Sequence, residues 1–240
     1  MNDFHIEAEP VIHALRGGLV VSCQPVENGP LDRDDIVVAY AQALSSSGAR
    51  ALRIEGVERV ALVKEQTNIP VIGIVKRDLS SSEVRITPLE QDVIELAKAG
   101  ADIIAIDGTL RKRPVPFSEL VILAKALGVR VMADCSNFDE GIEAADLQCD
   151  LVGSTLSGYI SGPTPTLPDV ELVKSWVSAG IRVMAEGRYN QPDYVREALE
   201  AGAWSCTVGS AITRPEFVTQ WFATQADKGF ARFNRSKGEL

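Results

Sequence analysis

The sequence predicts an α/β fold, a TIM (β/α)8 barrel with a short N-terminal helix. Eight short runs rich in Val and Ile recur along the chain, and most are continuously apolar, as in parallel strands covered on both faces. Helix-like segments separate these runs, and glycines suited to a helix C-cap follow several of them. The length of 240 residues also fits one barrel, which typically needs about 250.

The expected elements alternate along the chain in βα order, and together they form one domain over residues 1–240. The predicted strands are 18–24, 51–56, 71–76, 103–108, 130–136, 151–155, 182–187 and 205–210. The clearest helical segments are 34–47, 88–99, 117–127, 168–179 and 192–201, followed by Gly48, Gly100, Gly128, Gly180 and Gly202. A helix around residues 6–15 is expected at the bottom of the barrel, and the basic, polar residues 228–240 are expected to form a loosely held tail.

Composition narrows the class of function. A net charge of −9 argues against a nucleic-acid-binding surface, which would be basic. The four cysteines are scattered and form no C-x-x-C pair, as expected for reduced thiols in a cytoplasmic protein without a structural zinc site. The first five residues are polar and the longest apolar runs are strand-sized, so neither a signal peptide nor a membrane span is expected. No metal cluster or nucleotide motif is present, and no cofactor is expected.

Polar residues stand at the ends of the predicted strands, where a barrel enzyme carries its active site. Because side chains alternate along a strand, Lys76 shares a face with Ile72 and Ile74. By the same alternation Arg53 shares a face with Glu55, Asp134 with Met132, and Glu186 with Met184. If the apolar members fill the barrel interior, Lys76, Arg53, Asp134 and Glu186 meet in one pocket at its mouth. Asp107 and Thr155 are expected only at the rim or behind the site.

Glycine-rich loops after the seventh and eighth strands indicate a phosphate site. Barrel enzymes often hold a substrate phosphate in these two loops, where glycines let backbone N–H groups approach the anion. Gly187 and Arg188 follow the seventh strand, and Gly209, Ser210 and Arg214 follow the eighth. Arg188 or Arg214 would add a charge-assisted hydrogen bond.

Eight segments between Leu15 and Phe222 resemble the N-acylglucosamine-6-phosphate 2-epimerase family, in order and without large gaps. Each motif alone is weak, but together they are specific. The segments are LRGGLVVSCQP (15–25), ALRIEGVE (51–58), IPVIGIVKRDL (69–79), VRITP (84–88), ADIIAIDGT (101–109), STLSGY (154–159), VMAEGRYN (183–190) and TVGSAITRP (207–215).

The resemblance implies an isomerase that interconverts N-acetylmannosamine 6-phosphate and N-acetylglucosamine 6-phosphate, usually in sialic acid catabolism, and it suggests a homodimer. It also implies that Lys76 transfers the proton and that Glu186 is its partner at the reacting carbon. The implied sugar-binding residues are Gln24, Arg53 and Asp134. The implied phosphate-binding residues are Gly187, Arg188, Gly209, Ser210 and Arg214.

Inverting C2 by proton transfer requires C2 to be α to a carbonyl, so the reactive species should be the open-chain sugar and the intermediate an enolate. The sequence leaves open whether one base or two return the proton, and whether Glu186 is a second base or stabilises the lysine's charge. A Schiff-base aldolase using Lys76 is an alternative, as is another phosphosugar-binding barrel, a lyase or synthase. A non-catalytic sugar-phosphate sensor is a third, less favoured class.

Overall fold

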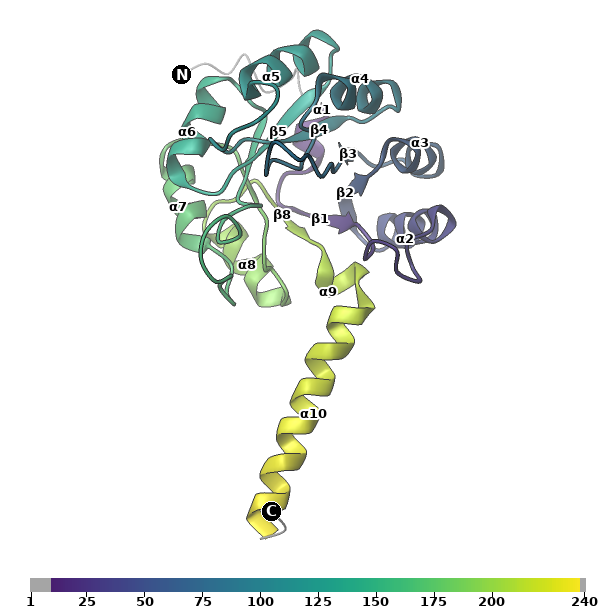
Figure 1. The fold of residues 1–240 in the computed structure, drawn as a ribbon, viewed down its shortest axis with the longest axis vertical. Helices are drawn as coiled ribbons and strands as arrows, with labels where there is room; N and C mark the ends of the chain where they lie inside the picture. The colour runs from purple at the N-terminus through teal and green to yellow at the C-terminus, as the bar shows by residue number, and fades with distance from the viewer. Residues whose placement is uncertain (1–9, 238–240) are drawn as a thin grey trace.

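The computed structural model describes residues 10–237, and within them eight parallel strands close into a barrel in sequence order, β1 pairing with both β2 and β8 (Figure 1). The predicted fold class is therefore confirmed. The strands are β1 Gly18–Cys23, β2 Ala49–Glu55, β3 Val71–Ile74, β4 Ile103–Asp107, β5 Arg130–Asp134, β6 Leu151–Gly153, β7 Val183–Ala185 and β8 Ser205–Val208.

Helices follow the strands and surround the barrel (Figure 1). All five glycines expected as helix stops adopt positive φ angles, from 78° to 102°, the backbone conformation that ends a helix. The helices are α1 Pro10–Ala14, α2 Asp34–Ser46, α3 Val57–Gln66, α4 Glu90–Lys98, α5 Phe117–Ala126, α6 Phe138–Asp146, α7 Val170–Ser178, α8 Pro192–Glu200, α9 Ser210–Thr213 and α10 Pro215–Lys237.

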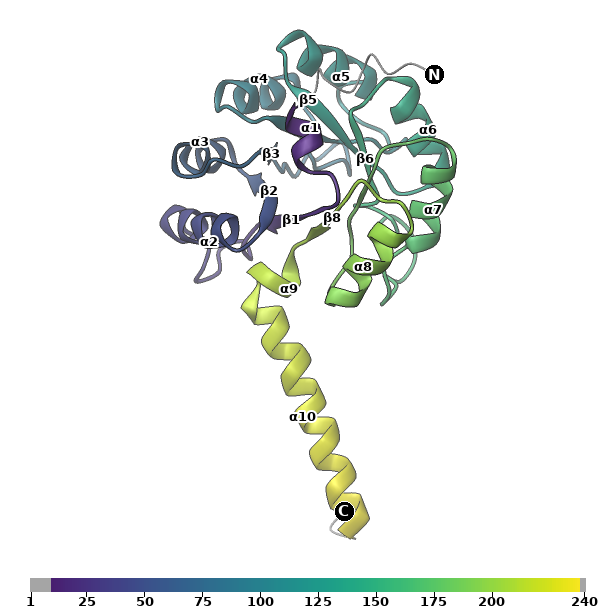
Figure 2. The ribbon, with the colours of Figure 1, turned by 180° about the vertical axis from the view of Figure 1, so that it is seen from behind.

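Two apolar cores follow from the alternation of side chains along the strands. One lies between the sheet and the helices, and the other fills the barrel, where Ile72, Ile74, Met132 and Met184 are fully buried as expected. α1 lies across one end of the barrel (Figure 2) and adds Ile12 to the inner core. This agrees with the predicted N-terminal helix over its residues 10–14, whereas residues 6–9 lie outside the described part of the chain.

The segment Val84–Thr87 returns to the barrel after the loop that follows β3. It lies between the carboxyl ends of β3 and β4. Lys76 and Ile86 form an antiparallel bridge, and the Asp107 N–H donates to the Ile86 carbonyl at 3.1 Å. Thr87 is fully buried at φ 47°, and its hydroxyl donates to the Ala105 carbonyl at 2.7 Å. The backbone of Lys76 is consequently held by hydrogen-bonded neighbours.

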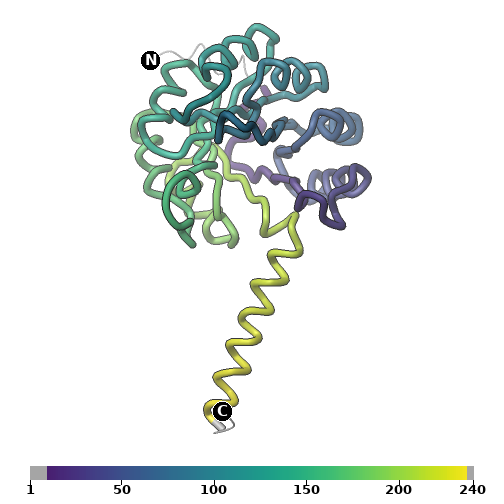
Figure 3. The backbone as a smooth tube through the Cα atoms, in the orientation of Figure 1, coloured from purple at the N-terminus to yellow at the C-terminus, as the bar shows by residue number. Residues whose placement is uncertain are grey.

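α10 leaves the barrel and projects away from it (Figures 1 and 3). Residues 228–237, expected to be a loosely held tail, are instead the continuous second half of this helix, and 238–240 lie outside the described residues. Phe222, Phe230 and Phe233 on α10 are exposed. Within residues 10–237 no helix combines the length and apolar character needed to cross a bilayer.

Candidate active site

A buried ion-pair network lies at the centre of the barrel mouth. Arg53, in β2, donates two hydrogen bonds to the Asp134 carboxylate from β5, at 2.7 and 3.0 Å. Its Nη1 also donates to Oε2 of Glu186, the residue that follows β7, at 3.0 Å. Arg53 is 1% exposed and Asp134 is fully buried, so this guanidinium is a fixed positive charge with two carboxylates around it.

The two carboxylates that share Arg53 are not equivalent. Asp134 binds it with both oxygens, and the Thr155 hydroxyl donates to Asp134 Oδ1 at 2.6 Å. Burial raises the pKa of Glu186 to about 7; the Arg53 charge opposes this rise and the Asp134 charge adds to it. Burial alone would lower the pKa of Arg53, but the neighbouring carboxylates raise it above its usual value. Glu186 is therefore the group in this network that changes charge near neutral pH.

Lys76 enters the same pocket from the segment after β3, but its ion pair is not with Glu186. Its Nζ donates to Oε2 of Glu55, the last residue of β2, at 2.9 Å. Sequence reasoning expected Glu186 as the carboxylate beside the lysine and placed Glu55 only on the face shared with Arg53. The mouth thus holds two ion-pair systems, one around Arg53 and one around Lys76.

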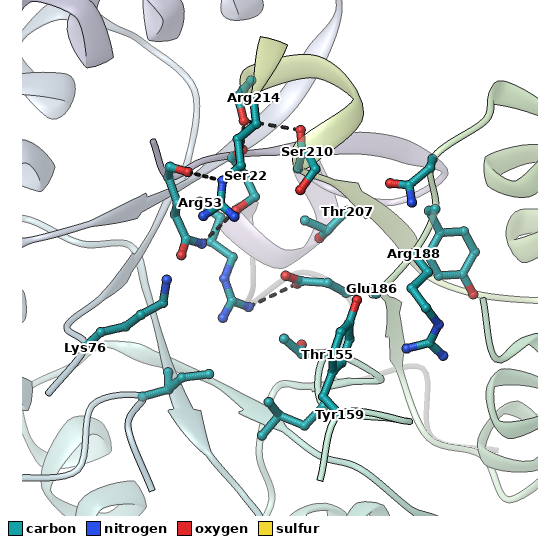
Figure 4. Close-up of a pocket in the computed structure, with 18 of the residues that line it drawn as sticks. Ser22, Arg53, Lys76, Thr155, Tyr159, Glu186, Arg188, Thr207, Ser210 and Arg214 are labelled. Carbon is teal, nitrogen blue, oxygen red and sulfur yellow. Dashed lines mark hydrogen bonds and ion pairs between the residues drawn. The ribbon is translucent and has the colours of Figure 1, made fainter. Parts of the chain in front are cut away.

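Arg53, Lys76 and Glu186 line one cavity of about 370 Å³ (Figure 4). Every predicted site residue lines it except Asp134, which lies behind Arg53 and holds it in place. The lining residues are Ser22, Gln24, Arg53, Lys76, Ile86, Thr155, Leu156, Tyr159, Glu186, Gly187, Arg188, Tyr189, Asn190, Thr207, Gly209, Ser210, Thr213, Arg214 and Trp221.

The loops after β7 and β8 form one side of this cavity, as the sequence predicts for a phosphate site. Gly187 adopts φ 97°, a conformation that favours glycine. Ser210 begins the short helix α9 directly after Gly209, so backbone N–H groups without helical partners lie at this wall. Arg214 is fixed by a 2.6 Å hydrogen bond from its Nε to the Gln24 carbonyl.

Arg188 is oriented differently from a simple phosphate ligand. Its Nε donates to the Leu167 carbonyl at 2.7 Å and its Nη1 to the Ser157 carbonyl at 2.5 Å. Its guanidinium also lies 5.0 Å from the centre of the Tyr159 ring. The side chain therefore anchors the loop after β6 to the cavity wall, and two of its five N–H donors are used by backbone carbonyls.

Sequence reasoning missed several residues at the site. Thr155, expected at the rim or behind the site, binds Asp134 behind Arg53 and also lines the cavity itself. Trp221 reaches the cavity from α10, and no pattern in the sequence connects that helix with the strand ends. Of these residues, Glu55 could have been predicted from the sequence, since it stands two residues after Arg53 and therefore on the same face of the strand. In the described part of the chain no group of three or more His, Cys, Asp or Glu could hold a metal ion.

A closed (β/α)8 barrel with a charged cavity at the carboxyl ends of its strands defines a barrel enzyme. Residues 37–228 match the family model described as "Putative N-acetylmannosamine-6-phosphate epimerase". The chain belongs to this epimerase family, a group of carbohydrate isomerases, and the resemblance read from its motifs is confirmed.

Curated relatives and solved structures agree with this assignment. The "Putative N-acetylmannosamine-6-phosphate 2-epimerase" of Pasteurella multocida is 53% identical over 213 residues, 89% of this chain and 93% of that protein. The solved N-acetylmannosamine-6-phosphate 2-epimerase of Clostridium perfringens is 39% identical with a TM-score of 0.87, over 93% of this chain and 99% of that one. The thiamine phosphate pyrophosphorylase of Pyrococcus furiosus, 17% identical with a TM-score of 0.59 over 84% and 89%, shares the fold alone.

Proposed function

We propose that this chain interconverts N-acetylmannosamine 6-phosphate and N-acetylglucosamine 6-phosphate by inverting C2, as a step of sialic acid breakdown. The observation that carries the proposal is the position of Lys76: an amine that can accept a proton faces the same cavity as the fixed Arg53 cation and the Glu186 carboxyl group. Family membership and the names of the relatives support the substrate.

In this mechanism the Lys76 amine removes the proton from C2 of the open-chain sugar, and the electron pair of the C–H bond moves into an enolate. The Arg53 charge stabilises the negative oxygen across the cavity. A proton returned to the opposite face of C2 completes the inversion. Glu186, with a pKa of about 7, is suited to supply or accept that proton at neutral pH.

The phosphate is proposed to lie against Gly187, Gly209 and Ser210, which line the cavity at the loops after β7 and β8 and can offer backbone N–H groups to an anion. Arg214 adds a positive charge there, and Arg188 adds the N–H donors that the backbone carbonyls leave over. The side-chain amide of Gln24 donates to the Ser22 hydroxyl at 2.7 Å, and its side-chain oxygen, Oε1, is left to accept a hydrogen bond from a sugar hydroxyl. Binding at the phosphate holds the sugar so that C2 stays near the amine.

Proton NMR of N-acetylmannosamine 6-phosphate with the enzyme in D₂O tests the proposal. We expect the second sugar phosphate to appear with solvent deuterium at C2, and the Lys76→Ala variant to be inactive while still folded. Full activity in that variant would overturn the role of Lys76. Borohydride treatment with substrate separates the aldolase alternative, because only a Schiff base would be trapped as a covalent adduct on Lys76.

We also infer that two copies associate as a homodimer by exchanging α10. A second cavity, of about 340 Å³, lies beside β1, β8 and α8, where a helix after β8 would cover the barrel, and its lining is mainly apolar. The exposed Phe222, Phe230 and Phe233 share one side of α10, which extends away from its own barrel. An apolar helix face and an uncovered apolar groove on the same chain support reciprocal exchange.

Light scattering after gel filtration tests this association. The wild type should have twice the 25.9 kDa mass of one chain, and Phe222→Asp with Phe230→Asp should reduce it to one. Ile122→Asp, at an equally exposed apolar residue on α5, is the matched control and should leave the mass unchanged. A monomeric wild type would contradict the inference.

We also infer a cytoplasmic location, which the absence of a disulfide among the four cysteines supports.

A further inference from the structure

We propose that Glu55 is the positioning residue of the Lys76 amine: its carboxylate holds the amine at the cavity and stabilises it while it carries the proton taken from the sugar. The inference rests on the proposed function, because it concerns how Lys76 performs the proton transfer. It adds a residue that touches no substrate and acts through the lysine.

The geometry restrains Lys76 from two sides. Its backbone is fixed by the Val84–Thr87 segment, with the Thr87 N–H donating to the Val75 carbonyl at 2.7 Å and the Arg77 N–H to the Arg85 carbonyl at 3.0 Å. The tip of its long side chain is held by the 2.9 Å contact with Glu55. Without that contact, a flexible four-carbon side chain has many positions in an open cavity.

Glu55 is itself placed by the sheet. It ends β2 directly beside Ile74 of β3, and the Gly56 N–H donates to the Ile74 carbonyl at 2.9 Å. Lys76 follows Ile74 by two residues, so neighbouring strands bring the two charges together. Because the register of β2 on β3 sets this distance, the pair is part of the barrel and not a chance contact of two mobile side chains.

Other charges around Lys76 are already engaged. Arg53 and Glu186 pair with each other, and Asp134 binds Arg53 from behind. Arg77 pairs with Asp92 of α4 at 2.6 Å, and Asp107 pairs with Arg111 at 2.7 Å. Arg188 and Arg214 bind backbone carbonyls on the far wall of the cavity.

The balance of the step explains why a carboxylate is needed here. When the amine takes the C2 proton, it becomes an ammonium and the sugar becomes an enolate, so a charge pair is created with no electron lost or gained. The Glu55 carboxylate stabilises the new ammonium, and Arg53 stabilises the new anion. When the ammonium gives this proton to C2 of the enolate or to solvent, the amine is restored for the next turnover.

The test is the pH dependence of epimerisation by Glu55→Gln, which keeps the shape and removes the charge. We expect kcat to fall about ten- to a hundredfold while KM changes less than about threefold. We also expect the acidic limb of the kcat/KM profile to move about one pH unit lower, since the ammonium form has lost its stabilising charge. A residue with a merely structural role would not move this limb.

Two further variants keep the test decisive. Glu55→Asp retains the charge with a shorter reach, so its profile should stay near that of the wild type while kcat falls less than in Glu55→Gln. Glu58→Gln, an exposed residue of α3, is the matched control and should match the wild type. The side chains of Lys76 and Glu55 are 25% and 31% exposed, so loss of this pair should leave the protein folded.

The outcomes separate the two proposals. An inactive Lys76→Ala together with an unchanged pH profile and kcat in Glu55→Gln would overturn the role of Glu55 and leave the proposed function standing. A fully active Lys76→Ala would overturn the proposed function itself. A shifted limb in Glu55→Gln, restored in Glu55→Asp, supports the positioning role.

Discussion

The substitution Glu186→Gln tests whether this glutamate holds a proton in the folded enzyme near neutral pH. Glu186 shares the Arg53 guanidinium with Asp134, which binds it through both oxygens. Burial raises the pKa of Glu186 from 4.5 to about 7 in spite of the cation beside it. The physical reason is that one positive charge cannot fully compensate two buried carboxylates.

The sign of the effect on stability follows from proton uptake. Between about pH 4.5 and pH 7, the folded protein holds a proton on Glu186 that the unfolded chain has released. The free energy of unfolding therefore falls as the pH rises through this window. A pKa displaced from 4.5 to about 7 corresponds to about 3 kcal/mol. Glutamine does not titrate, so the variant lacks this decrease.

The assay is urea unfolding at fixed ionic strength, followed by tryptophan fluorescence, at several pH values from 4.5 to 8. The unfolding free energy of the variant minus that of the wild type should become about 3 kcal/mol more positive across this range. Any constant difference is irrelevant, because only the pH-dependent part reports the proton. Glu171→Gln, at a side chain 83% exposed, should show no such change. A difference that stays flat with pH would refute the reasoning.

Three other substitutions probe hydrogen bonding and packing in the barrel and its helix layer. Asp134→Asn leaves the buried guanidinium without its bidentate partner, and the unfolding free energy should fall by about 3–5 kcal/mol, seen as a lower urea midpoint; an unchanged midpoint would contradict the importance of the pair. Gly141→Ala places a methyl group against the Trp176 indole and should cost about 1–3 kcal/mol, whereas Gly229→Ala on α10, with open space around it, should cost nothing. Thr87→Val keeps the shape but loses the hydroxyl bonded to the Ala105 carbonyl, so the thermal midpoint should drop by the equivalent of about 1–3 kcal/mol. A wild-type midpoint would show that this bond contributes little.

Much of the barrel could be predicted because its signal is local. Runs of β-branched residues and glycine helix stops need no distant partner to be recognised, and all eight strands fall where the sequence places them. The strand ends were less exact: Lys76, Thr155 and Glu186 were assigned to strands but lie just beyond them. Each strand ends where its regular ladder of hydrogen bonds to both neighbours ends, and this depends on strand register, which no local residue pattern records.

Which site residues form ion pairs with each other was harder to predict than which residues line the cavity. Alternation placed Arg53, Lys76 and Glu186 on one cavity, but ion pairing depends on strand register and side-chain reach. The register of β2 on β3 brings Glu55 to Lys76, and the ring of strands brings Glu186 to Arg53. The helical structure of residues 228–237 was not predicted, because the charged residues there obscure the spaced aromatic residues that mark one face of a helix.

The Val84–Thr87 segment has a consequence for the timing of the reaction. Since the backbone on both sides of Lys76 is bonded into the sheet, the amine can move only through its own side-chain torsions. Rotamer changes of exposed side chains take picoseconds to nanoseconds, and breaking a partly exposed ion pair, which costs about 1 kcal/mol or less, slows Lys76 by less than about tenfold. Typical enzymes turn over about 1 to 1,000 times per second. If Lys76 serves both faces of C2, its motion would be complete long before turnover ends. The slow step would then lie elsewhere, in opening the sugar ring or in breaking the C2–H bond.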